Sequence, residues 1–109
     1  MESSSAIETF AALAHPGRLA VFRLLVQAGP EGVAAGEIAR QLETPANTMS
    51  AQLAILTRAG LIAARRDGRS IVYAADFDRV RDLLQFLMED CCQGRPEVCA
   101  PVAAAAVCG

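Results

Sequence analysis

The chain has 109 residues, a length that fits one domain with a single hydrophobic core. Its net charge of −2 argues against a uniformly basic nucleic-acid binder. The acidic, polar N-terminus does not resemble a secretion signal, and the apolar C-terminal stretch is too short to cross a bilayer, so we expect a cytoplasmic protein with no membrane partner. In that compartment, four cysteines indicate metal binding or thiol chemistry rather than structural disulfides.

The middle of the chain is basic although the whole is acidic. Residues 40–74 carry five arginines against two acidic residues, and the remainder is correspondingly acidic. All ten cationic side chains are arginines, whose planar guanidinium suits phosphate. This pattern is typical of a nucleic-acid-binding patch and also of an ordinary solvated surface, and charge alone does not separate the two.

The first two predicted helices meet at His15-Pro16-Gly17. The first helix runs from a capping Ser3 or Ser4 to about residue 14. The second runs from Pro16 to about residue 27, because proline suits a first helical turn. Apolar residues at helical spacing predict the buried face of each helix. The expected inward residues are Ile7, Phe10, Ala11 and Ala14 in the first helix, and Leu19, Phe22, Leu25 and Val26 in the second.

Two short helices joined by a tight turn are predicted after the loop at residues 29–32, as in a helix-turn-helix. The first covers about residues 34–42. The second begins with Thr44 as cap and Pro45 in its first turn, and ends at Gly60, which can adopt the left-handed conformation. The expected buried residues are Ile38, Ala39, Leu42, Met49, Leu53 and Leu56. The opposite face of the second helix carries Asn47, Thr48, Ala51 and Gln52, with Ser50 at its margin.

A β-hairpin and a fifth helix complete the prediction. Residues 61–66 and 70–74 form two strands around Asp67-Gly68, a two-residue turn signal with positive φ at both positions, unless the loop is one residue wider. Asp76 caps a helix over residues 77–89. Its apolar side is formed by Val80, Leu83, Leu84 and Leu87. The predicted fold is mainly α with a β-hairpin wing, a winged helix-turn-helix over residues 1–90, followed by a cysteine-bearing segment over residues 91–109.

Three segments of the chain resemble the arsenical-resistance (ArsR/SmtB) repressors in their order and spacing. These are LAHPGRLAVFRLL, AGEIARQL and NTMSAQLAILTRAGLIAARRDGRSIVYA, and the resemblance extends over about residues 10–89. It implies a homodimer joined through the first and last helices. Such a dimer binds operator DNA without its ligand and releases the DNA when the ligand binds, so we do not expect an enzyme.

The exposed face of the fourth helix is the expected reading surface for operator DNA. Asparagine and glutamine offer a paired donor and acceptor to adenine, while serine and threonine reach base edges or phosphates. Alternation along a strand directs Arg65 and Arg66 to opposite faces, so at most one reaches phosphate, and Arg18 and Arg40 are further candidates for contacts with the DNA backbone. The DNA-binding residues that we expect are Asn47, Thr48, Ser50, Gln52, Arg58, Arg66 and, in a minor groove at the hairpin tip, Arg69.

Cys91, Cys92 and Cys99 can bring three sulfur atoms together. A disulfide between Cys91 and Cys92 would be strained, because adjacent Cα atoms lie about 3.8 Å apart and a relaxed disulfide needs roughly 4.4 to 6.8 Å. The segment before Cys99 contains Gly94 and Pro96 and is long enough to curl back. Three thiolates without a fourth ligand suit As(III) or Sb(III), with cadmium, lead or zinc as alternatives.

The resemblance favours a metalloid inducer at these cysteines. Many family members carry a cysteine pair in the third helix, and zinc-sensing members carry histidines on the last helix, but this chain has neither. Arsenite repressors with a C-terminal three-cysteine site are a known variation. We therefore expect As(III) at Cys91, Cys92 and Cys99. A thiol redox switch, inert cysteines and a small thiol enzyme are the alternatives, while Cys108 is interpreted as incidental and His15, the only histidine, as a helix-junction residue.

Overall fold

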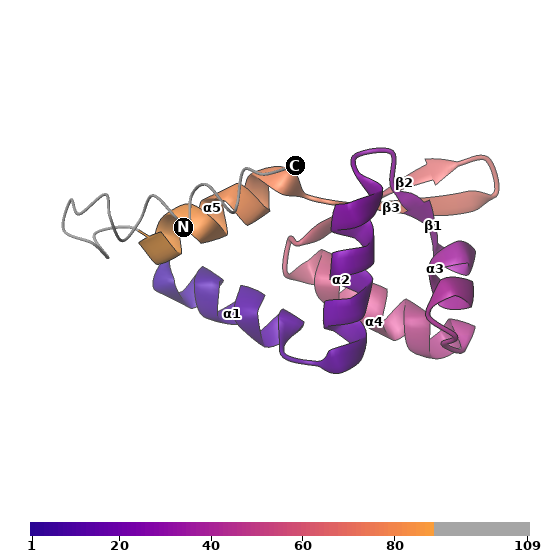
Figure 1. Ribbon diagram of the computed structural model, residues 1–109, viewed down its shortest axis with the longest axis horizontal. Coiled ribbons are helices and arrows are strands. Elements are labelled where there is room, and N and C mark those ends of the chain that lie inside the picture. The colour runs from indigo at the N-terminus through magenta and orange to yellow at the C-terminus, as the bar shows by residue number, and fades with distance from the viewer. Residues whose placement is uncertain (89–109) are drawn as a thin grey trace.

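A computed structural model describes residues 1–88, and within this range the predicted helix order and hairpin are confirmed (Figure 1). One element was missed, a short strand directly before the third helix. No helix in residues 1–88 is long and apolar enough to span a membrane. The elements are α1 (Ser3–Leu13), α2 (Pro16–Ala28), β1 (Val33–Ala34), α3 (Ala35–Gln41), α4 (Ala46–Arg58), β2 (Ile62–Asp67), β3 (Ser70–Ala75) and α5 (Phe77–Met88).

The missed strand β1 makes the wing part of a three-stranded antiparallel sheet with the order β1-β3-β2. Val33 pairs with Tyr73 and Ala34 with Val72. Gly32 permits this pairing, because its φ is 76° and a Cβ there would lie 2.5 Å from the Tyr73 carbonyl oxygen. A two-residue strand is too short to show alternation in a sequence, which is why it was not predicted.

The hairpin turn lies one residue later than predicted. The pairing of β2 with β3 ends at Asp67 and Ser70, so the two-residue loop is Gly68-Arg69 and not Asp67-Gly68. Gly68 has a φ of 64°, whereas Asp67 is a strand residue without positive φ. A glycine at the first loop position matches the twist of a tight hairpin. Arg69 therefore lies at the tip of the wing itself.

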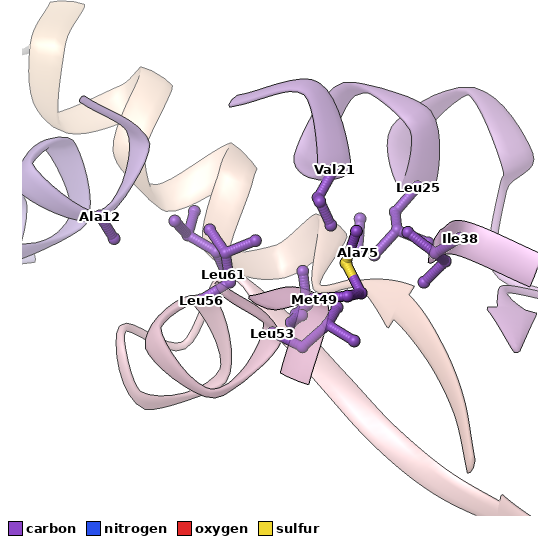
Figure 2. Packing of buried hydrophobic residues seen from close by; sticks show 10 residues of the cluster. Ala12, Val21, Leu25, Ile38, Met49, Leu53, Leu56, Leu61 and Ala75 are labelled. Carbon is purple, nitrogen blue, oxygen red and sulfur yellow. The ribbon is translucent and has the colours of Figure 1, made fainter. Parts of the chain in front are cut away.

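The hydrophobic core lies between the inner faces of α2, α3 and α4 and the adjoining ends of the strands (Figure 2). Met49, Leu53 and Leu56 of α4 are fully buried, as predicted, and Gly60 ends the helix with a φ of 79°. Burying one leucine side chain stabilises the fold by roughly 1.5–3 kcal/mol. These contacts fix the inward face of α4, and its polar face is consequently turned outward. The ten core residues are Ala12, Val21, Leu25, Ile38, Met49, Leu53, Leu56, Leu61, Ile62 and Ala75.

The predicted inward face of α1 was wrong. Ile7 and Phe10 are 66% and 41% exposed, whereas Ala6, Thr9 and Ala12 are buried. The small residues allow α1 to approach its neighbours closely, and the Thr9 hydroxyl can be buried because it donates a hydrogen bond to the Ser5 carbonyl at 2.8 Å. The larger apolar side chains of α1 thus form an outward stripe.

The apolar sides predicted for α2 and α5 are only partly buried. In α2, Leu25 is buried but Leu19 and Val26 are exposed, and Val21 occupies the core instead. In α5, Leu83 is buried, whereas the other two leucines of the predicted side are not. Helical spacing identified an apolar face in each case, but the described residues do not cover that face completely. The exposed α5 leucines are Leu84 and Leu87.

Two of the predicted N-caps were wrong and one was confirmed. The N-cap of α1 is Glu2 rather than Ser3 or Ser4, and the N-cap of α4 is Pro45 with no side-chain hydrogen bond. The Thr44 hydroxyl instead donates to the carbonyl of Leu42 at 3.0 Å, within the turn of the helix-turn-helix. Asp76 caps α5 as predicted, because its Oδ1 accepts a hydrogen bond from the Arg79 backbone N–H at 3.1 Å.

His15 joins α1 to α2, as the sequence indicated. Its Nδ1 accepts hydrogen bonds from the backbone N–H groups of Gly17 at 3.1 Å and Arg18 at 3.4 Å. The Arg18 side chain reaches back to α1, where Nε donates to the Ala12 carbonyl at 2.6 Å. The side chains of His15 and Arg18 thereby link the end of α1 to the start of α2.

Replacing His15 tests this cap. His15→Ala should lower the free energy of unfolding by about 1 kcal/mol, because two N–H groups at the start of α2 lose their acceptor. His15→Asn supplies another capping oxygen and should retain most of the stability. Urea denaturation of the variants at one fixed protein concentration measures the difference. Equal losses in both variants would contradict the capping role.

Candidate nucleic-acid interface

A tight turn sets the third and fourth helices against each other. Glu43 adopts a φ of 50°, and the backbone N–H of Thr44 donates to the Ala39 carbonyl at 2.9 Å. This turn allows Ile38 of α3 and Met49 of α4 to enter the same core. The outer face of α4 is left open to solvent.

Most of the predicted base-reading residues lie on this outer face. Asn47, Thr48 and Ser50 are exposed, and so is Ala51, which directly follows Ser50. The Thr48 backbone N–H donates to Asn47 Oδ1 at 2.9 Å, so the oxygen end of this amide is used at the start of α4. The structure therefore brings together three short polar side chains within the first two turns of the helix.

Gln52 differs from the other three residues because it is half-buried. Its carboxamide packs against Gly17 at the start of α2: a Cβ added to Gly17 would lie 2.5 Å from Gln52 Nε2. Helical spacing predicted Gln52 among the outward residues of α4, but the structure packs its carboxamide on α2, and a contact with a residue 35 positions earlier leaves no mark in the local pattern.

The wing carries three of the predicted arginines. Arg69 is exposed at the tip, and Arg66 is exposed beside its cross-strand partner Ile71. Arg65 pairs with Val72 on the other face, which confirms the predicted alternation. Its Nη2 donates to the Glu31 carbonyl at 2.8 Å, so this guanidinium is already engaged with the loop before β1. Arg66 is thus the better placed of the two for phosphate.

Arg40 is held by an acidic partner in the same helix. Its guanidinium donates from Nε to Glu37 Oε1 at 2.8 Å and from Nη2 to Oε2. Hydrogen bonds from Arg40 and then from Gln41 lower the pKa of Glu37 to about 2, and the same carboxylate raises the pKa of Arg40. Both groups are therefore ionised at neutral pH, and the positive charge of Arg40 is largely compensated locally.

The two remaining arginine candidates lie away from the start of α4. Arg18 is engaged with the carbonyls at the end of α1. Arg58 is exposed in the last turn of α4, eleven residues after Asn47 and hence about 16 Å further along the helix axis. It lines a shallow groove with Glu8 and Ile55 between α1 and α4. A phosphate contacted by Arg58 would be a different one from those near the wing.

Arg79 is a positioning residue that the sequence did not reveal. From the first turn of α5, its Nη2 donates to the Ala59 carbonyl at 3.3 Å, and its guanidinium packs beside Gly60. It thus supplies a cation and a donor to the C-terminal end of α4. Local sequence patterns contain no signal for such a contact between separate elements.

The predicted inducer site lies outside the described residues. Cys91, Cys92, Cys99 and Cys108 all follow residue 88, as does the predicted boundary at residue 90. Within residues 1–88, no group of three or more His, Cys, Asp or Glu side chains could hold a metal ion.

Comparisons with known proteins agree with this geometry. A family model described as a helix-turn-helix domain matches residues 13–65. An HTH-type transcriptional regulator of Mycobacterium tuberculosis is 36% identical over 78 residues, which are 71% of this chain and 66% of that protein. An HTH-type transcriptional regulator of Methanocaldococcus jannaschii is 34% identical over 84 residues, 77% of this chain and 92% of that protein. The matched part of this chain therefore spans just under two thirds of the mycobacterial relative and nearly all of the archaeal one.

A solved structure extends the comparison to the wing. It is the homodimeric winged helix-turn-helix DNA-binding domain of a Mycobacterium bovis protein described as a possible ArsR-family regulator. It is 31% identical, with a TM-score of 0.63 over 80% of this chain and 81% of that one. The helix pair, the polar face of α4 and the wing define a winged-helix DNA-binding protein. The chain belongs to the helix-turn-helix transcriptional regulators of the ArsR-like winged-helix family, whose members are DNA-binding regulators and not enzymes.

Proposed function

We propose that this regulator is a cytoplasmic homodimeric repressor of an arsenic-resistance operon, released from its operator when As(III) or Sb(III) binds Cys91, Cys92 and Cys99. The observation that carries DNA binding is the exposed polar face of α4 beside a wing tipped by Arg69. The choice of inducer rests on the three cysteines of the sequence and on the resemblance to arsenical-resistance repressors.

DNA recognition would use two elements at once. The start of α4 enters the major groove, where short polar side chains reach base edges without steric conflict. The tip of the wing lies along the neighbouring minor groove, whose negative potential favours arginine. The base-reading residues would be Asn47, Thr48, Ser50 and Gln52, with Arg69 in the minor groove and Arg58 and Arg66 on phosphates.

Dimerisation through α1 and α5 would cover their exposed apolar side chains. Both helices lie at the end of the molecule opposite the wing (Figure 1). Ile7 and Phe10 of α1 and Leu84 and Leu87 of α5 are exposed in the single chain. Burying such an apolar surface is the main driving force of association, and the related Mycobacterium bovis domain is homodimeric. Two α4 helices would then face half-sites about one DNA turn apart or more on a palindromic operator.

Three thiols suit trivalent arsenic for reasons of charge as well as softness. Arsenous acid exchanges its three hydroxyl groups for three cysteine sulfurs, and each hydroxyl leaves as water with a thiol proton. The product is neutral, so no isolated cation has to be buried. Cys91 follows the last described residue of α5 by three positions. A ligand at this place would therefore act first on the helix that is proposed to form the dimer.

The wing contact is tested by the salt dependence of DNA binding. A duplex selected from a random-sequence library by the full-length protein serves as the probe. Arg69→Ala should weaken binding and, on each subunit, reduce the slope of log K against log salt by about 0.9 for each phosphate charge that the guanidinium in the minor groove neutralises. Fluorescence anisotropy at several salt concentrations measures both quantities.

Arg81→Ala is the matched control for this measurement. Arg81 is exposed on α5 and paired with Asp78, away from the reading face. Its removal changes the net charge of the protein by the same amount and should leave the slope unchanged. An identical change of slope in the two variants would show that Arg69 acts only through overall charge.

A further inference from the structure

Gln52 occupies a place that only a glycine at position 17 leaves open. A Cβ at Gly17 would lie 2.5 Å from Nε2, 2.9 Å from Oε1 and 3.0 Å from Cδ of Gln52. All three atoms belong to the end of one flexible side chain. The carboxamide of a proposed base-reading residue is therefore packed on the bare backbone of α2.

This packing is not reinforced by hydrogen bonds from the start of α2. The N–H groups of Gly17 and Arg18 both donate to His15 Nδ1, and the Arg18 guanidinium is directed to the end of α1. Among residues 1–88, no hydrogen bond holds the Gln52 carboxamide. Side-chain rotation can therefore move the Gln52 carboxamide off Gly17 and out to the reading face without breaking a protein hydrogen bond.

Comparison with Gly32 shows what is particular about Gly17. A Cβ at Gly32 would meet the Tyr73 carbonyl, which is backbone and cannot move away, and Gly32 also has positive φ. Gly17 lies in a helix, its φ is not positive, and the obstacle is a movable side chain. An alanine at position 17 is therefore compatible with the fold but not with the observed position of Gln52.

We propose that Gly17 is a specificity-determining residue for DNA recognition, because it lets Gln52 withdraw from the reading face until DNA is bound. The inference rests on the proposed binding of DNA through α4. When a protein binds through a conformation that is only partly populated, its apparent dissociation constant is the intrinsic value divided by that population. Gly17 thus lowers the population of the conformation in which Gln52 can contact a base. A side chain at position 17 would raise that population, because it excludes the packed conformation.

The experiment compares Gly17→Ala with Gly36→Ala in the full-length protein. Both glycines are the second residue of their helix, and a Cβ at Gly36 meets nothing within 4 Å. The two variants thus share the gain in helix propensity but differ in the contact with Gln52. Each is made with and without Gln52→Ala, and all are titrated with the selected duplex and with its single-base-pair variants.

The expected result is specific to one base pair in each half-site. Gln52→Ala should reduce discrimination there roughly 5- to 150-fold, the range for one paired side-chain contact with a base. Gly17→Ala should tighten binding a few-fold and sharpen preference at the same base pair. It should have no effect when Gln52 is already alanine, and Gly36→Ala should behave as wild type in both backgrounds.

Several results would overturn the inference. An equal effect of Gly17→Ala with and without Gln52 would show that position 17 acts independently of it, and base preferences unchanged in Gln52→Ala would remove Gln52 from readout. In the wild-type protein, the nuclear Overhauser effect between the Gln52 side-chain amide and the Gly17 Hα protons should disappear on binding DNA. Its persistence would also overturn the inference. Failure of the wild-type protein to select any duplex would instead refute the proposed function and this inference with it.

Discussion

Arsenite should weaken binding of the wild-type protein to its operator by roughly 5- to 150-fold, the range of typical allosteric couplings. Cys91→Ser should bind the operator as tightly as wild type and should no longer respond to arsenite. Serine is nearly the same size as cysteine, but its hydroxyl is a poor ligand for a soft metalloid. Anisotropy titrations of the selected duplex, with and without arsenite, measure both effects.

Cys108→Ser is the internal control for the response to arsenite, because it removes one thiol outside the proposed trio. It should respond as wild type does. Release of Cys91→Ser by arsenite would refute the assignment of Cys91. Release of the wild type by peroxide but not by arsenite would favour the redox alternative, in which Cys99 forms a disulfide with Cys91 or Cys92.

A single charge on α1 should separate the two subunits. Phe10→Glu places a carboxylate within the apolar surface proposed to be buried in the dimer, where an unpaired charge is strongly unfavourable. The variant should be monomeric by light scattering after size exclusion. Its affinity for a palindromic duplex should fall by roughly 10²- to 10⁴-fold, because the second half-site is no longer reached by a linked subunit.

Leu19→Glu is the matched control for this substitution. Leu19 is exposed to nearly the same degree as Phe10, 43% against 41%, but lies on α2. It should remain dimeric and bind the palindrome as wild type does. A dimer that survives Phe10→Glu with unchanged affinity would place the subunit interface elsewhere.

The sequence predicted the helix-turn-helix well because its signals are local. Met49, Leu53 and Leu56 repeat at helical spacing, and this spacing also identifies the outward residues of α4. The stripe of Ile7 and Phe10 was equally visible, but periodicity reports that a face is apolar and not which surface covers it. In the single chain the smaller residues of α1 face the core.

The features that were not predicted depend on contacts between distant residues. Arg65 donates to the Glu31 carbonyl and Arg79 to the Ala59 carbonyl, and neither arginine can be distinguished in the sequence from one that is free to meet phosphate. The packing of Gln52 on Gly17 is of the same kind. Composition and spacing thus identified the exposed polar face of α4 that is proposed to contact DNA, while the contacts of individual side chains depend on the tertiary structure.

The short strand β1 has a mechanical consequence. It leads directly into α3 and pairs with β3 of the wing, and Arg65 of β2 is bonded to the loop before it. β1 and the Arg65 side chain therefore tie the wing to the helix-turn-helix, whose α4 is proposed to enter the neighbouring groove. This coupling limits how far the wing can move relative to the helix-turn-helix. If both elements contact DNA as proposed, a duplex with the right bases but a different offset between adjacent grooves should bind less tightly, because these contacts hold the wing against the helix-turn-helix.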